Sequence, residues 1–446
     1  MLPNRASWIA AAKVEANFDA ARLRTMIKPT LLERLRSSAV RALLTAYLAA
    51  CRAFAALGRS KRPAAPDGCD VLLTGTFHSR NWVAAHLGPL AASSRCARVR
   101  VVTSVPLPPI EKVEALAPPP SLEWLLGQVG ARLAYFAWMA LRTRPHVVGG
   151  YHLLVNGLAA ILVGRIAGAR SLYICTGGRT EVLDGGVWGE NRLFGRLAAP
   201  QPGIERQLVG AVNAADGVIV KGPRAAAFMR QRGVRVPMHF MTGAIEWRRY
   251  SPQAVPRDFD LVLVGRLVQV KRVDVFLRTV RLLCDRRPQT RAVIVGDGPL
   301  RGELERLAND LQIAAAVHFA GHQEDVASWL HRGRVFVLTS DSESLALSLM
   351  EATMCGVPSV VSDVGDLAAL VHEGVNGYLI RDRTPEQFAS CLSRLLQDEP
   401  RLARLRAETR RASLHLRVDA VGRKWDVILD ALVTQGIVPA GVRSLA

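Results

Sequence analysis

Two glutamates stand eight residues apart in a stretch whose second half is otherwise apolar. Glu343 belongs to the polar run Asp341-Ser-Glu-Ser, and Glu351 lies within the apolar run from Leu347 to Cys355. A mostly buried helix offers no favourable surroundings for an ionised side chain. Two interpretations are open at this point. Glu351 is a buried acid paired with protein groups, as most buried acids are, or it faces a ligand.

The residues before this apolar run are suited to bind an anion. We expect a helix to begin near Leu345 or Ala346 and to end at Gly356, which leaves Glu343 in the preceding loop. The backbone amides of Ser344, Leu345 and Ala346 are then unsatisfied donors at a helix amino terminus. Such amides, together with the helix dipole, favour a phosphate group.

Two basic residues follow an earlier strand and suit the same ligand. Arg266 and Lys271 lie in the loop after the apolar segment 261–264. Arginine presents a planar fork to phosphate oxygens, and lysine presents a compact charge. Taken alone, they are two exposed bases after a strand. Combined with the helix amino terminus, they predict a clamp for a diphosphate.

The elements that must position these residues form a series of alternating strands and helices after the linker 251–256. The predicted strands are 261–264, 292–295, 317–320, 335–338 and 359–362. The predicted helices are 272–284, 300–311, 346–355 and 386–396. This alternation is typical of a parallel, doubly wound sheet, whose ligands bind at the carboxyl ends of the strands.

A first series of the same kind precedes the linker. Its predicted strands are 71–74, 99–103, 146–150, 172–176 and 217–221, and its helices include one from about Trp82 and one over 122–142. We expect the proline-rich residues 106–120 to form a loop. Two such series predict an α/β protein with two Rossmann-like, doubly wound domains that face each other across a cleft.

Residues 1–66 differ from both series. They contain 12 Lys and Arg against 3 Asp and Glu, which is close to half of the net charge of +20. Residues 37–57 are nearly apolar, but Arg41 and Arg52 interrupt them, and a spanning helix needs roughly 20 apolar residues. The segment is either an amphipathic helix on an anionic membrane surface or a helical extension packed on the next domain.

Length and composition set the broad class. A chain of 446 residues predicts more than one domain: an extension (1–66), an amino-terminal domain (67–252), a carboxyl-terminal domain (253–412) and a final helix (413–446) that packs back toward the amino-terminal domain. The seven cysteines form no CxxC pair, so we expect neither a disulfide framework nor a zinc site. Reduced thiols and the lack of signal-peptide features in the first residues predict a cytoplasmic protein.

The second series carries motifs that resemble a known family, the retaining glycosyltransferases of group 1 (family 4), which have the GT-B fold. The motifs are Val264-Gly-Arg-Leu-Val-Gln-Val-Lys271, Val295-Gly-Asp-Gly-Pro299, Val317-x-Phe-x-Gly321, Glu343-x7-Glu351, Gly356-x-Pro358, Asp363-x-Gly365, Glu373-Gly-x-Asn-Gly-Tyr378 and Glu246-x3-Tyr250-x-Pro252. Each motif alone is weak, but their order and spacing are specific. The resemblance covers residues 245–400, is weaker over 67–245 and is absent from 1–66.

The resemblance implies a site for a nucleoside-diphosphate sugar in the carboxyl-terminal domain. Arg266 and Lys271 would bind the diphosphate, and Glu351 would accept hydrogen bonds from the ribose hydroxyls. Glu343 and the amides of Ser344, Leu345 and Ala346 would hold the sugar and the phosphate. The base would lie near Phe319, Gly321 and His322. Arg266, Lys271 and Glu343 would then be the catalytic residues, with no metal ion and no other cofactor.

The amino-terminal half departs from the family. Many members carry a histidine after the strand equivalent to 172–174, whereas this chain has Cys175-Thr-Gly-Gly-Arg-Thr-Glu181. The donor-sugar contact of that histidine is therefore unassigned, and His152 is as well explained by an ordinary turn. The loop 74–81 resembles the glycine loop that approaches the acceptor. The acceptor candidates are Gly75, Thr76, Arg80 and Gly177.

Charge and resemblance together predict a retaining glycosyltransferase that acts on a lipid-linked or surface-glycan acceptor. Its basic residues would hold it, as a peripheral protein, on the anionic inner face of the membrane. A soluble small-molecule acceptor, a GT-B nucleotide-sugar epimerase and a non-catalytic binder are the alternatives. Nucleic acid is not an expected partner, because no basic stripe with interleaved aromatic residues is present.

Overall fold

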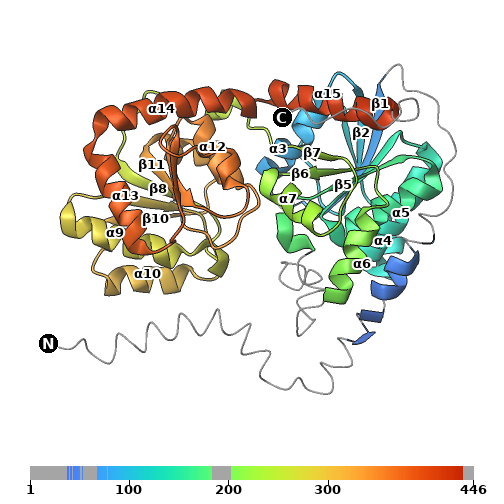
Figure 1. The fold of residues 1–446 in the computed structure, drawn as a ribbon, viewed down its shortest axis with the longest axis horizontal. Coiled ribbons are helices and arrows are strands. Elements are labelled where there is room, and N and C mark those ends of the chain that lie inside the picture. The colour runs from blue at the N-terminus through green and yellow to red at the C-terminus, as the bar shows by residue number, and fades with distance from the viewer. Residues whose placement is uncertain are drawn as a thin grey trace.

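The protein consists of two α/β domains that lie side by side (Figure 1). The computed structural model describes residues 38–39, 41–42, 44–50, 53, 68–77, 79–182 and 202–434. Predictions that concern residues 1–37, 54–66 and 435–446 lie outside these ranges. Among the described residues, no helix has the length and apolar character needed to cross a bilayer.

The amino-terminal domain is built on a seven-stranded parallel sheet with the order β3-β2-β1-β4-β5-β6-β7. Its strands are β1 (Cys69–Thr74), β2 (Cys96–Val102), β3 (Val113–Leu116), β4 (Val147–Tyr151), β5 (Arg170–Ile174), β6 (Gly217–Val220) and β7 (Met238–Phe240). Its helices are α3 (Arg80–Ala91), α4 (Pro120–Thr143), α5 (Leu158–Ala167), α6 (Pro202–Val212) and α7 (Pro223–Gln231).

Strand β1 shows how the sheet separates two apolar layers. Val71 and Leu73 pack with α3 on one face, whereas Leu72 packs with α4 and α5 on the other. This alternation follows from the two-residue period of a strand. All three side chains are buried because helices cover both faces of the sheet, as expected for a parallel sheet.

The short helix α8 (Trp247–Tyr250) leads into the carboxyl-terminal domain, a six-stranded parallel sheet with the order β10-β9-β8-β11-β12-β13. Its strands are β8 (Phe259–Val264), β9 (Ala292–Val295), β10 (Val317–Gly321), β11 (Gly333–Leu338), β12 (Ser359–Ser362) and β13 (Gly377–Ile380). Its helices are α9 (Val273–Arg286), α10 (Arg301–Asp310), α11 (Val326–His331), α12 (Leu347–Met354), α13 (Pro385–Gln397) and α14 (Glu399–Ser413).

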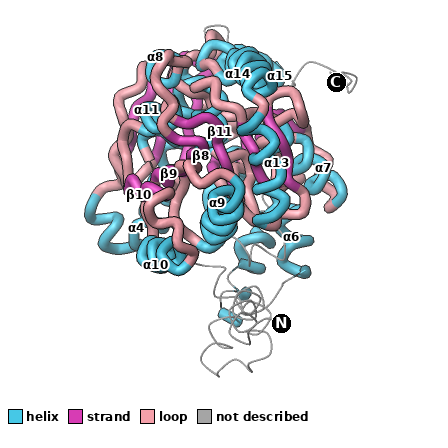
Figure 2. Tube along the Cα trace, turned by 90° about the vertical axis from the view of Figure 1, so that its left-hand side faces the viewer, coloured by secondary structure: helices cyan, strands magenta, loops and turns pink. Residues whose placement is uncertain are grey.

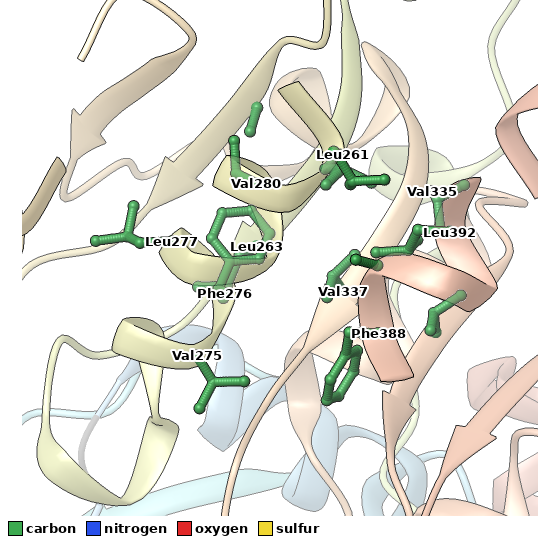
Figure 3. Packing of buried hydrophobic residues seen from close by; sticks show 14 of the residues in the cluster. Leu261, Leu263, Val275, Phe276, Leu277, Val280, Val335, Val337, Phe388 and Leu392 are labelled. Carbon is green, nitrogen blue, oxygen red and sulfur yellow. The ribbon is translucent and has the colours of Figure 1, made fainter. Parts of the chain in front are cut away.

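The core of this domain confirms the predicted helical face at residues 386–396. Phe388 and Leu392 are fully buried, and they lie among side chains of β8, β11 and α9 (Figure 3). Helix α13 begins after Thr384, whose hydroxyl accepts a hydrogen bond from the amide of Gln387. Pro385 occupies the first helical turn, where its missing amide costs nothing.

The last described helix, α15 (Val418–Thr434), returns to the amino-terminal domain. Helices α14 and α15 run along one side of both domains in Figure 1 and lie next to each other in Figure 2. Val421, Trp425 and Leu429 are buried in the same cluster as Leu87 of α3. The chain therefore completes the amino-terminal core with its last helix.

The described part of the extension contains a helical segment over 44–50. Leu44 and Leu48, one helical turn apart, are buried in a cluster with Leu153 and Leu208 of the amino-terminal domain. For these residues the structure shows packing on the next domain, which was one of the two interpretations of this segment.

Three strands were missed or mispredicted. The proline-rich residues 106–120 were expected to form a loop, but they contain the edge strand β3. Strand β3 itself contains no proline, so the prolines on either side of it do not interrupt its pairing with β2. Strands β7 and β13 are also short edge strands. Their few residues carry too little periodic pattern to be recognised.

Candidate active site

Loops at the carboxyl ends of both sheets meet between the domains. Asn81, at the start of α3, donates a hydrogen bond to Glu351 of α12 (3.3 Å). Arg224, at the start of α7, forms an ion pair with Asp363 after β12 (2.7 Å). A methyl group added at Gly178, after β5, would lie 3.5 Å from Oγ of Ser344. We call this region the interdomain site.

The structure brings Lys271 and Glu343 together. Lys271 ends the short helical turn Gln269–Lys271 after β8, and its Nζ lies 2.5 Å from Oε1 of Glu343. Ser340 donates a second hydrogen bond to the same oxygen (2.7 Å). Both charged side chains are mostly buried, so water screens their attraction only weakly. The ion pair lies beside the amino terminus of α12.

Helix α12 begins close to the predicted position. Its first residue is Leu347, after the cap residue Ala346, and its last is Met354. Among the described residues, none accepts a hydrogen bond from the amides of Ser344, Leu345 or Ala346. The hydroxyl of Ser344 is also buried with no partner in this part of the chain. These groups are the donors that an anion at this place would use.

The loop that carries Arg266 is fixed from beneath by two glycines. A Cβ atom at Gly296 would lie 2.0 Å from the carbonyl oxygen of Gly265, and one at Gly298 would lie 2.5 Å from that of Leu267. Only glycine permits this close approach, and φ at Gly296 is +141°. The Gly-Asp-Gly run therefore supports the loop that carries Arg266. The Arg266 side chain is exposed.

Glu351 is bound by protein groups on one oxygen. Its Oε1 accepts hydrogen bonds from the hydroxyl of Tyr250 (2.9 Å) and from Asn81, and the residue is 4% exposed. Burial raises its pKa to about 7, although the hydrogen bonds from Tyr250 and Asn81 act in the opposite direction. Pairing with protein groups, the first of the two initial interpretations, therefore describes Oε1 in this structure.

The residues expected near the base lie at the end of β10. Gly321 adopts a positive φ of 71°, and its carbonyl accepts from the amide of Gly296. Phe319 packs against the domain core, and His322 is exposed. Among these three, His322 is the side chain open to solvent.

The acceptor candidates are split between two loops of the amino-terminal domain. Gly75 is buried against Tyr151, where an added Cβ would lie 3.0 Å away, while Thr76 and Arg80 are exposed. Gly177 lies after β5, and its amide donates to Glu181. Loops at the ends of β1 and β5 therefore surround the carboxyl end of β4, which lies between them in the sheet.

A cluster around Glu181 escaped the sequence interpretation. The amides of Leu153 (2.8 Å) and Thr176 (2.9 Å) and the hydroxyl of Tyr173 (2.6 Å) donate to this carboxylate. Nδ1 of His152 lies 3.2 Å from Oε1 of Glu181 and 2.9 Å from the hydroxyl of Thr176. Burial alone would raise the pKa of Glu181, but the hydrogen bonds and charge of His152 and the other donors lower it.

Lys221 is the second group missed by the sequence interpretation. It directly follows β6 and is 5% exposed, and burial lowers its pKa to about 8 against the opposing effects of Cys175 and Glu181. The strand order β4-β5-β6 places His152, Thr176 and Lys221 at neighbouring strand ends. Each of these residues is unremarkable in its own segment. A prediction of the strand order would have been needed to recognise that they lie together.

A carboxylate of one domain caps a helix of the other. Helix α7 begins after Gly222, which has no side chain to serve as a cap. Asp366, after β12, accepts hydrogen bonds from the amides of Arg224 (2.8 Å) and Ala225 (3.3 Å). A Cβ atom at Gly222 would lie 2.6 Å from the Asp366 carboxyl group. The two domains are therefore in close contact beside the interdomain site.

The described residues contain no group of three His, Cys, Asp or Glu side chains arranged to hold a metal ion.

Comparison with known proteins shows which sequences and folds this chain resembles. Residues 258–398 match the family model described as "Glycosyl transferases group 1". The match lies within the carboxyl-terminal domain, which is therefore similar to group 1 glycosyltransferases. A sucrose-phosphate synthase from Thermosynechococcus elongatus has a similar structure, with a TM-score of 0.67 at 17% identity over 82% of this chain and 100% of that one. HepE from Anabaena in complex with UDP has a TM-score of 0.63 at 18% identity over 81% and 100%. The protein has the GT-B fold.

Curated relatives are similar over part of their length. D-inositol 3-phosphate glycosyltransferase from Thermomonospora curvata is 34% identical over 263 residues, which are 55% of this chain and 59% of the relative. The Vi polysaccharide biosynthesis protein VipC/TviE from Salmonella typhi is 34% identical over 136 residues, 30% of this chain and 24% of the relative. The chain thus spans about three fifths of the first relative and a quarter of the second.

Proposed function

We propose that this GT-B protein is a retaining glycosyltransferase of family 4 that transfers a sugar from a nucleoside-diphosphate sugar. The observation that carries the proposal is the Lys271–Glu343 pair beside the amides of Ser344 to Ala346, which have no acceptor among the described residues. All of these groups lie within the segment that matches group 1 glycosyltransferases. HepE was solved with UDP and with UDP-glucose, which supports a nucleotide-sugar donor.

Catalysis in this proposal depends on stabilising the leaving group. Transfer breaks the bond between the sugar and the diphosphate, and negative charge develops on the phosphate oxygens. Lys271, Arg266 and the amides at the start of α12 would receive that charge, as an oxyanion site does. The acceptor hydroxyl would attack from the same face of the sugar and pass its proton to a donor phosphate oxygen. Glu343 would release Lys271 in part and bind sugar hydroxyls.

Glu351 would accept hydrogen bonds from the ribose hydroxyls through its second carboxylate oxygen. Oε1 accepts hydrogen bonds from Tyr250 and Asn81, and among the described residues none donates a hydrogen bond to Oε2. A carboxylate can accept from hydroxyl groups on each oxygen separately. The proposed ribose contact is therefore compatible with the observed pair.

For the acceptor we propose a lipid-linked or surface-glycan precursor at the cytoplasmic face of the inner membrane. The relative from Salmonella typhi, named for polysaccharide biosynthesis, supports this class. The relative from Thermomonospora curvata is named for a soluble acceptor, D-inositol 3-phosphate, and supports the small-molecule alternative. Turnover with inositol phosphate, compared with turnover with a membrane extract, separates the two. Transfer to neither, with donor binding intact, would favour a non-catalytic binder or an epimerase.

The first experiment is a thermal-shift screen of nucleotides and nucleotide sugars, with UDP and UDP-glucose as the first ligands. A ligand at 100 times its Kd adds about 2.7 kcal/mol of stability. Lys271→Met should lose most of the shift. Arg286→Ala removes an exposed charge on α9 of the same domain and should keep it. If no nucleotide or nucleotide sugar stabilises the wild-type chain, the proposal is wrong.

The proposed transfer needs no metal ion. Turnover should therefore be the same after dialysis against EDTA as in added Mg²⁺ or Mn²⁺. A loss of more than roughly tenfold that the metal restores would contradict this part of the proposal.

A further inference from the structure

One helix of the amino-terminal domain exposes an unusual amount of apolar surface. Of the 13 large hydrophobic residues exposed in the described part of the chain, six lie on α4. They are Trp124, Leu125, Leu126, Val129, Trp138 and Leu141, which we call the α4 apolar surface. Trp124 is 88% exposed and Leu125 is 67% exposed. Contiguous apolar patches on a protein surface usually mark an interaction site.

The first turns of α4 are separated from the rest of the helix by a break. Gly127 has φ 68° and ψ 166°, so it breaks the helix after Leu126. Consecutive residues of a helix point about 100° apart, and a helix that packs on its domain hides at least one of three neighbours. Trp124, Leu125 and Leu126 are all exposed. Leu122 is half-buried, whereas these three side chains are exposed to solvent.

The second half of α4 also exposes apolar side chains. Phe136 and Ala140 face the domain core, whereas Trp138 and Leu141 are exposed on the other side. The guanidinium of Arg142 lies 5.3 Å from the centre of the Trp138 ring. Tryptophan beside arginine is a combination suited to the boundary between lipid headgroups and acyl chains, because the ring is amphipathic and the cation meets phosphates.

The distribution of charge along the chain indicates which kind of partner binds to the α4 apolar surface. Residues 67–252 contain 21 Lys and Arg against 11 Asp and Glu, and residues 1–66 contain 12 against 3. Residues 253–412 contain 21 of each. Almost all of the positive excess therefore belongs to the part of the chain that carries α4. An anionic bilayer complements both the charge and the apolar surface.

The position of α4 relates this surface to the interdomain site. Helix α4 follows β3, so it begins at the carboxyl end of the sheet, the same edge as the Gly75 loop after β1. In the sheet, β3 is separated from β1 by β2 alone, which is a lateral distance of about 10 Å. A bilayer in contact with Trp124 would thus lie at the rim of the proposed acceptor loops.

We propose that the α4 apolar surface docks the protein on an anionic lipid bilayer, with Trp124, Leu125 and Leu126 inserted among the headgroups. The proposal rests on the proposed function in one respect: a membrane-borne acceptor is what gives docking on a bilayer a role in the reaction. Vesicle binding by itself needs neither donor nor acceptor.

The test is co-sedimentation of the full chain with vesicles of phosphatidylcholine, with or without phosphatidylglycerol. We expect binding to the mixed vesicles to exceed binding to the neutral ones. The triple variant Trp124→Ser/Leu125→Ser/Leu126→Ser should partition roughly tenfold less. The control Leu414→Ser/Val427→Ser also replaces exposed apolar residues, outside α4, and should bind as the wild type does. Trp124→Phe, alone, should keep most of the binding.

All substituted side chains are exposed, so equal thermal midpoints should show that each variant is folded. Wild-type binding that the triple variant retains would overturn the proposal, and so would a wild-type chain that ignores both vesicle types. Self-association that only the triple variant loses, measured by light scattering without vesicles, would assign the surface to a second copy instead. Stabilisation by UDP-sugars, measured without vesicles, keeps a failure of donor binding distinguishable from a failure of docking.

Discussion

Glu351 is a carboxylate in surroundings that favour its neutral form. Burial raises its pKa from the ordinary 4.5 to about 7, so the folded state holds a proton that the unfolded chain releases. The stabilisation of the folded state that comes from holding this proton is fully present below pH 4.5 and is lost as the pH rises toward 7. The hydrogen bond from Tyr250 limits the loss by stabilising the ionised form.

We expect Glu351→Gln to remove this pH dependence. A pKa difference of this size corresponds to about 3 kcal/mol at most, and we expect a change of about 2 kcal/mol. Urea unfolding of both proteins between pH 5 and pH 8 should show that the free energy of unfolding of the variant increases relative to that of the wild type as the pH rises. The exposed Glu111→Gln should follow the wild type at every pH. A constant difference between wild type and Glu351→Gln would contradict the assignment.

Arg266→Ala should lower turnover by roughly 10²–10³-fold, because one donor to the developing phosphate charge is lost. The fold should be unaffected, since the side chain is exposed. Arg286→Ala, also exposed in the same domain, is the matched control and should keep the wild-type kcat. Full activity of Arg266→Ala would show that this residue does not bind the diphosphate.

His152 and Glu181 should act together, with Glu181 as a positioning residue. Glu181→Gln replaces an acceptor oxygen by an amide, leaves buried donors unpaired and should cost about 1–3 kcal/mol. His152→Ala should cost less stability but lower kcat about 10–100-fold, because the ring meets Thr176 at the loop next to Ser344. In Glu181→Gln the pH profile of kcat should also shift, which a purely structural role would not produce. Unchanged kcat in His152→Ala would exclude the cluster from the reaction.

At the scale of elements, α7 depends on a cap from the other domain. Gly222→Ala would place a Cβ 2.6 Å from the Asp366 carboxyl group and push the cap away from the helix. We expect a loss of about 0.5–2 kcal/mol, the usual range for a lost amino-terminal cap. Gly210→Ala, on α6 with open space around it, should be neutral or slightly stabilising. Urea unfolding measures both variants, and equal stability of the two would show that the Asp366 contact contributes nothing.

Elements with long periodic patterns were predictable from sequence, and the short edge strands were not. Helix α13 shows its buried face in the spacing of Phe388 and Leu392, and α12 begins within two residues of the expected position. Ordered motifs singled out Lys271 and Glu343, which the structure places in contact, and their role in binding a donor stays a prediction. The Glu181 cluster was not singled out, because it depends on which strands are neighbours, and strand order is not a property of any one segment.

At the scale of the whole molecule, the two domains differ in charge as well as in sequence resemblance. The carboxyl-terminal domain, where family motifs are dense, has equal numbers of acidic and basic residues. The amino-terminal half carries the positive excess and diverges from the family pattern. In the proposed function the neutral carboxyl-terminal domain would bind the donor and the basic amino-terminal domain the acceptor, which is the division expected if only the acceptor comes from an anionic surface.

The return of α15 to the amino-terminal domain has a consequence for synthesis on the ribosome. The α3 face that receives Val421 and Trp425 is translated more than 300 residues before them. At the usual rate of about 5–20 residues per second, this apolar face waits on the order of tens of seconds for its covering helix. The nascent chain therefore offers a binding surface to chaperones for the whole time in which the carboxyl-terminal domain is made.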